Sequence, residues 1–162
     1  MKIVFLLLVL YQIKHFVCDY PLQGSYMLGK FKPYPQFILP LLAHSLVHGT
    51  YTFFIAWCFK SWPVALTLAL FDMGMHFTID RVKASPTLGG RWTALSKNEM
   101  QNEILPCLER WNKIGLIPHE LVIEHYDVLT RLKSNTYFWW ALGADQMAHH
   151  LTHYIIILGL IS

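Results

Sequence analysis

Residues 144–154 read ADQMAHHLTHY and lie in one of the most apolar stretches of the chain. Asp145, His149, His150 and His153 fall on consecutive turns of a helix that otherwise has the composition of a membrane span. Ionisable groups inside a bilayer are costly and rare, and they usually face a polar interior. The stretch therefore predicts a membrane helix with one functional polar side.

The composition favours a small membrane protein. The chain has 162 residues, of which 54% are hydrophobic, 15% aromatic and only 14% charged, against about 25% charged in an average soluble domain. A net charge of +3 spread along the chain argues against nucleic acid as a partner. Cys18, Cys58 and Cys107 are odd in number and lack CxxC spacing, so they predict no disulfide framework. We expect one membrane domain over residues 1–162.

Long apolar runs predict an all-α membrane protein built as a four-helix transmembrane bundle, since a span needs about 20 residues. The expected spans are residues 3–20, 36–59, 62–83 and 136–161. The first resembles a secretory signal, but no small-residue cleavage site follows it, so we expect a retained helix.

A polar insert, residues 84–135, separates the third and fourth spans. The capping-box spacing SKNE at 96–99 predicts a helix to about residue 111, and a second helix is expected over 119–132. Most Lys and Arg residues lie in this insert or between the first two spans. The positive-inside rule therefore places the helical insert in the cytoplasm and both termini outside.

Each predicted span carries two metal-competent side chains four residues apart, an i,i+4 spacing that puts both on one helix face. The pairs are His15 and Asp19, His44 and His48, His76 and Asp80, and Asp145 and His149. In an up-down-up-down bundle the four pairs fall at the same side of the membrane. Five histidines and three aspartates are therefore expected in one polar layer.

The cost of burying charge favours a metal at this layer. An unpaired aspartate at mid-membrane costs about 2.5–3.5 kcal/mol even on lenient scales, and we expect no matching set of Lys or Arg beside these three. Eight ligands suit two divalent ions, and His and Asp without thiolates suit zinc, manganese or iron. The alternatives are a proton or ion path and plain polar packing between helices.

Other polar residues beside the pairs have supporting roles in this prediction. Gln23 and Gln146 are expected to orient a ligand or a bound water. Lys30 and Lys83 are expected mainly as anchors at the lipid headgroups. Arg81 and Lys83 are the candidates for contacting a phosphate and steering the anionic substrate.

Three further polar residues share the predicted membrane helices. His150 and His153 lie on turns rotated away from the Asp145–His149 face, which predicts supporting or structural roles. Asp72 precedes His76 by four residues, and its spacing fits a packing hydrogen bond and a ligand role equally well.

Four sequence segments contain the paired residues: HFVCDYPLQ (15–23), AHSLVHG (43–49), HFTIDRVK (76–83) and DQMAHHLTH (145–153). These segments resemble the bacterial and phage membrane family known as domain of unknown function 3307. The matched positions are His15, Asp19, Gln23, His44, His48, Gly49, His76, Asp80, Lys83, Asp145, Gln146 and His149. The resemblance covers the first 85 and about the last 25 residues; it implies a bacterial inner-membrane location and no agreed activity. A looser similarity links the chain to inner-membrane metal-dependent hydrolases.

The layer predicts a two-metal hydrolase at the cytoplasmic face. Asp19, Asp80 and Asp145 are the candidates for bridging the metals or acting as general base, and the depth of the site favours a phospholipid or lipid-linked phosphoester. One alternative is a protein that transports or senses a divalent cation. Another is a phage or host membrane-interaction protein stapled by a structural metal. Metal identity, oligomeric state and the role of the insert stay open.

Overall fold

The computed structural model describes residues 2–32, 34–85, 88, 106 and 134–162. These residues form the α-helices α1 (Lys2–Asp19), α2 (Ile38–Trp57), α3 (Trp62–Ala84) and α7 (Thr136–Ile161), and the short 3-10 helix η1 (Met27–Phe31). The prediction of an all-α, four-helix architecture is confirmed. Apart from residue 106, the two helices predicted within the insert lie outside the described residues.

The chain divides into two compact units. The first unit comprises Met1–Arg81 and Gln146–Ser162, and the second comprises Val82–Asp145. Both α3 and α7 pass from one unit into the other. The first unit therefore holds all of α1 and α2 and most of α3 and α7.

Local sequence explains where the helices begin and end. Pro21, which has no N–H to donate, follows the end of α1. Pro40 lies in the first turn of α2, where a missing N–H costs no helical bond. At the start of α7, Asn135 caps the helix because its side-chain oxygen accepts a hydrogen bond from the N–H of Tyr137 (3.0 Å).

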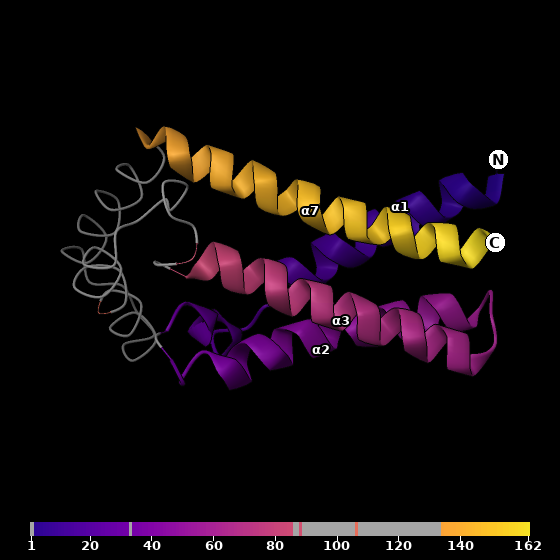
Figure 1. The fold of residues 1–162 in the computed structure, drawn as a ribbon, viewed down its shortest axis with the longest axis horizontal. Coiled ribbons are helices and arrows are strands. Elements are labelled where there is room, and N and C mark those ends of the chain that lie inside the picture. Colours follow the sequence, from indigo (N-terminus) through magenta and orange to yellow (C-terminus); the bar gives the residue numbers. More distant parts are fainter. Residues whose placement is uncertain (1, 33, 86–87, 89–105, 107–133) are drawn as a thin grey trace. The chain divides into compact units, whose positions relative to one another are not determined.

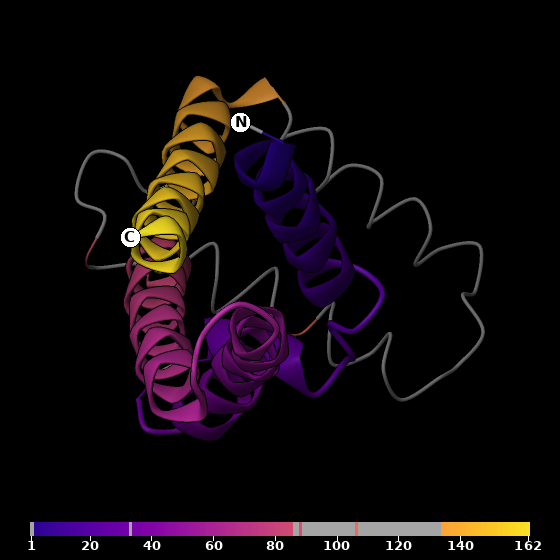
Figure 2. The ribbon, with the colours of Figure 1, turned by 90° about the vertical axis from the view of Figure 1, so that its right-hand side faces the viewer.

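The helices of the first unit form an antiparallel bundle. The α2 and α3 helices lie side by side, and the start of α1 and the end of α7 lie at the end of the bundle where α2 and α3 are joined (Figure 1). Viewed along the bundle, α1 and α2 are neighbours, α2 is followed by α3, and α7 lies between α3 and α1 (Figure 2). One face of each helix thus points to a common interior.

That interior changes character along its length. Near the chain termini it is apolar, and its buried members are Leu7, Tyr11, Ala56, Ala65, Ile156, Ile157 and Leu160. Farther along the bundle the buried side chains are charged or polar, including Lys14, His44, His48, Asp72, His76 and Asp80. The polar half of the interior provides the candidate site.

The outward sides of the helices are apolar. Large exposed hydrophobic residues occur on every helix, for example Phe5 (70% exposed), Leu39 (66%) and Leu158 (62%). Among the helices that the structure describes, α2 and α3 are long and apolar enough to cross a membrane. The α1 and α7 helices carry ionisable residues on their interior faces, such as Lys14 and His153.

Candidate metal site in the polar half of the bundle

Close contact between α2 and α3 brings two of the predicted ligands together. A Cβ atom added to Gly49 would lie 3.1 Å from the carbonyl oxygen of Ala69 and 3.2 Å from Cβ of Met73. Glycine therefore permits an approach that a larger residue would prevent. Beside it, the rings of His48 and His76 stack with their centroids 3.6 Å apart.

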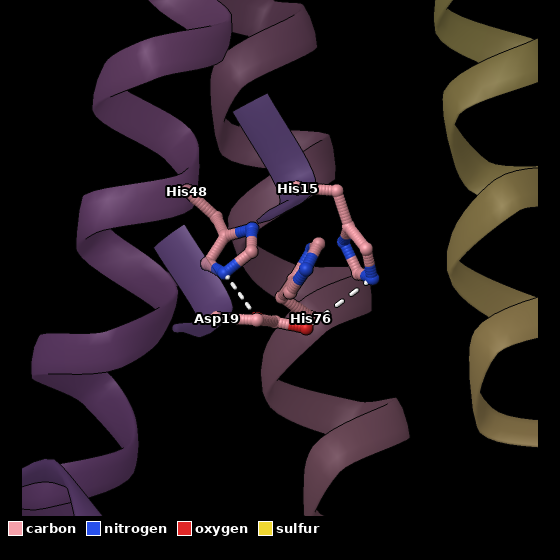
Figure 3. A group of neighbouring side chains, drawn as sticks. All are labelled: His15, Asp19, His48 and His76. Carbon is pink, nitrogen blue, oxygen red and sulfur yellow. Dashed lines mark hydrogen bonds and ion pairs between the residues drawn. The ribbon is translucent and has the colours of Figure 1, made fainter. Parts of the chain in front are cut away.

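Four predicted ligands from three helices meet around this stacked pair. His15, Asp19, His48 and His76 each offer a ligand atom, and these atoms lie within 4.8 Å of one another. Figure 3 shows the three imidazoles grouped at the Asp19 carboxylate. His48 Nε2 is 2.9 Å from Asp19 Oδ1, and His15 Nε2 is 3.2 Å from Asp19 Oδ2. We call these four residues the His3Asp cluster.

The His3Asp cluster has the chemistry of a metal site. A tetrahedral zinc with bonds of about 2.0–2.1 Å holds its ligand atoms about 3.3 Å apart, so modest side-chain rotation would close the cluster on an ion. The side chain of Asp19 is 18% exposed, whereas those of His48 and His76 are 0% exposed. The cluster is therefore accessible mainly from the Asp19 side.

A neighbouring group surrounds the second predicted carboxylate, Asp80. His44 Nε2 lies 3.2 Å from Asp80 Oδ2, and His149 Nε2 lies 3.4 Å from Asp80 Oδ1. Lys30 also reaches this carboxylate and donates to Asp80 Oδ2 at 2.7 Å and to Gln23 Oε1 at 2.9 Å. Because Lys30 is buried in this ion pair, its expected main role as a headgroup anchor is wrong.

The sequence analysis did not predict a second buried ion pair, between Lys14 and Asp72. Lys14 on α1 donates to Asp72 Oδ2 on α3 at 2.5 Å, and the exposed fractions of the two side chains are 1% and 0%. Thr52 donates to the same oxygen at 2.6 Å, and His153 Nε2 lies 3.4 Å from Lys14 Nζ. Asp72, His76 and His153 form a further group of metal-competent atoms, but a lysine ammonium already neutralises its carboxylate.

These lysines correct the charge argument made from the sequence. The expectation that Asp19, Asp80 and Asp145 lack matching Lys or Arg partners is wrong for two of the three, because Lys30 pairs with Asp80 and Lys83 pairs with Asp145. Asp19 differs from both, since its ion-pair partners among the described residues are the imidazoles of His15, His44 and His48. Asp19 is therefore the carboxylate for which an added cation is most needed.

Periodicity could have revealed Lys14. The buried residues of α1 are Leu7, Tyr11, Lys14, His15 and Cys18, which follow the three- and four-residue spacing of one helix face. A lysine on the inward stripe of an apolar helix needs a buried anion. Asp72, at an interior position of α3, is the corresponding acid.

The remaining predicted residues have varied surroundings. Gln146 Oε1 lies 3.1 Å from His15 Nε2, beside the His3Asp cluster. The guanidinium of Arg81 lies over the ring of Phe37, with Cζ 3.6 Å from the ring centroid. Asp145 belongs to the second unit, where Lys83 donates to its Oδ2 at 2.6 Å. Seven of the eight predicted ligands thus lie in the first unit, and Asp145 lies in the second; their ligand roles stay predictions.

The fold and the site together define a helical bundle with buried clusters of histidine and aspartate that could hold metal ions. A family model described as "Protein of unknown function (DUF3307)" matches residues 4–161, and the chain belongs to this family. The predicted resemblance is confirmed, and the match also extends across the insert, which the resemblance had left out. No curated protein and no solved structure gives a significant match.

Proposed function

We propose that this protein is a four-span membrane protein that binds a divalent metal ion at the His3Asp cluster. The observation that carries the proposal is the convergence of four largely buried ligand atoms within 4.8 Å. Three imidazoles and a carboxylate, without a thiolate, suit zinc, manganese or iron. A divalent ion would also supply the counter-charge for Asp19, whose ion-pair partners among the described residues are histidines.

The proposal of a membrane location rests on an inverted distribution of polarity. Charged side chains are buried inside the first unit, and large apolar side chains cover its outside. Exposed apolar area on this scale marks a surface that another apolar phase covers. The hydropathy of α2 and α3 supports the same location, and the Lys and Arg distribution favours an inner-membrane protein with a cytoplasmic insert.

We place the first ion at the His3Asp cluster and treat a second as conditional. A second ion at Asp80, His44 and His149 would compete with the ammonium of Lys30, 2.7 Å from Asp80. An ion at Asp72 would likewise compete with Lys14. Metal stoichiometry therefore separates a one-metal protein from the two-metal protein predicted from the sequence.

Hydrolysis of a phospholipid or lipid-linked phosphoester is the activity we propose for this site. A bound divalent metal lowers the pKa of its water to about 7 and stabilises charge on a phosphoryl oxygen. Asp19, the most exposed member of the cluster, would face the substrate and accept the proton of the water. Asp19 is also the last residue of α1, which favours a substrate that approaches at headgroup depth.

A structural metal is the second candidate, favoured by the complete burial of His48 and His76. Structural sites are closed, whereas catalytic sites keep a coordination position open. Transport has less support, because the apolar core cluster fills the bundle between the polar half and the chain termini. A cation would have to cross that cluster without a polar partner.

Elemental analysis of detergent-purified protein tests the proposal. We expect about one equivalent of a divalent metal in the wild type and its loss in His48→Ala. His150→Ala is the matched control, because His150 lies outside the metal-competent groups found among the described residues. A metal-free wild type that stays metal-free when titrated with zinc would refute the proposal, and equal metal content in both variants would refute the assigned site.

Hydrolysis is tested separately with metal-loaded protein and a phospholipid phosphomonoester in mixed micelles. Phosphate release by the wild type that is lost in both His48→Ala and Asp19→Asn would support a catalytic site. A metal-loaded wild type that releases no phosphate, and whose thermal stability falls on chelation, would favour the structural role.

A further inference from the structure

The two nitrogens of the His76 imidazole have different surroundings. Nδ1 lies 3.3 Å from Oδ1 of Asp72, one turn earlier on α3. Nε2 is buried and has no hydrogen-bond partner among the described residues. A neutral imidazole carries a proton on one nitrogen and a lone pair on the other. If Asp72 accepts the proton of Nδ1, the lone pair belongs to Nε2, the nitrogen left for a metal.

Two donors determine which oxygen of Asp72 faces His76. Lys14 Nζ on α1 and Thr52 Oγ1 on α2 both donate to Oδ2, at 2.5 Å and 2.6 Å. Oδ1 therefore remains for His76. Lys14 also balances the charge of Asp72, which is needed because neither side chain has contact with solvent.

We propose that Asp72 is a positioning residue for the metal site, and this inference rests on the proposed function. Asp72 holds His76 in the tautomer with the proton on Nδ1, and Lys14 and Thr52 hold Asp72 in the orientation that does so. Metal-binding histidines commonly donate their other N–H to a carboxylate, which sets both the tautomer and the ring orientation. Asp72 acts through His76 and is not itself the ligand.

The substitution Asp72→Asn tests this arrangement because an amide has one oxygen and one NH2 group. Lys14 and Thr52 both donate to the Oδ2 position, so the amide oxygen will occupy it. The NH2 group then faces Nδ1 of His76 and donates to it, which moves the imidazole proton to Nε2. In Lys14→Met/Asp72→Asn the amide is free to turn, because the Thr52 hydroxyl can accept from the NH2 group.

The measurements use the full-length protein in detergent. Two-bond 1H–15N correlation of 15N-histidine-labelled, metal-free protein reports the tautomer of each imidazole, and His76→Gln assigns the signal of His76. Competition with a zinc chelator reports affinity. We expect the Nδ1–H form in the wild type and the Nε2–H form in Asp72→Asn, with zinc affinity lower by about 10- to 100-fold. The double variant should regain the Nδ1–H form and part of the affinity.

The possible results distinguish a failure of the positioning role of Asp72 from a failure of the proposed metal site. An Asp72→Asn protein with the Nδ1–H form, or with wild-type zinc affinity, would overturn the positioning role while the metal site stood. A wild type that binds no zinc would instead remove the proposed function. If Asp72→Asn does not fold, Asp72→Glu replaces it, because it keeps a charge for Lys14 but displaces the oxygen from His76. Unchanged zinc affinity in Asp72→Glu would then overturn the inference.

Discussion

The closeness of α2 and α3 makes Gly49 a position where a larger side chain should destabilise the bundle. In Gly49→Ala the new methyl group would lie 3.1 Å from the carbonyl oxygen of Ala69, and a helix carbonyl cannot rotate away. The two helices must therefore move apart by a few tenths of an ångström. Overpacking of this kind costs about 1–3 kcal/mol, while the better helix propensity of alanine returns about 1 kcal/mol. We expect a net loss of up to about 2 kcal/mol in the free energy of unfolding.

The same movement should also weaken metal binding. His48 precedes Gly49, and its ring stacks on that of His76 at 3.6 Å, so separating the helices opens the His3Asp cluster. The assay is reversible unfolding in mixed detergent micelles followed by circular dichroism, with zinc affinity measured on the same samples.

Gly74→Ala is the matched control, because no atom lies within 4 Å of an added Cβ at Gly74 in the middle of α3. This variant should be as stable as the wild type or more stable by up to about 1 kcal/mol, with unchanged zinc affinity. Equal stabilisation by both substitutions would show that α2 and α3 are not closely packed at Gly49. The proposed close approach of the two helices beside the His3Asp cluster would then be wrong.

Three other predictions concern charge, pH and topology. Lys30→Met leaves Asp80 without its ammonium partner and should lower the free energy of unfolding by about 3–5 kcal/mol, measured in the same micelle assay. Lys60→Met is the control, because Lys60 forms no ion pair with the described residues, and it should change the free energy of unfolding by less than about 0.5 kcal/mol. Zinc affinity measured by equilibrium dialysis should fall as the pH is lowered, because protons compete with the metal for the three imidazoles; an affinity that does not change with pH would contradict histidine ligation. The exposed Cys58 should react with a membrane-impermeant maleimide in intact cells, and Cys107 only after permeabilisation; the reverse pattern would invert the proposed orientation.

Much of the fold and of the candidate ligand set could be predicted from the sequence, because both depend on local periodicity. Apolar runs of about 20 residues between prolines and polar segments predict helices, and an i,i+4 pair such as His44 and His48 must share a helix face whatever that helix packs against. The resemblance to a known family rests on the same four blocks, and the family match confirms it.

Only the tertiary structure decided which charges face one another. Lys14 and Asp72 are 58 residues apart, and Lys30 and Asp80 are 50 residues apart, so their pairing depends on the rotation and axial shift of whole helices. Sequence spacing along one helix carries no information on either quantity. For the same reason, the special position of Asp19, among imidazoles, emerged only from packing. Local periodicity determines which side chains point inward, and helix packing determines whether a buried carboxylate meets a lysine or a set of histidines suited to a metal ion.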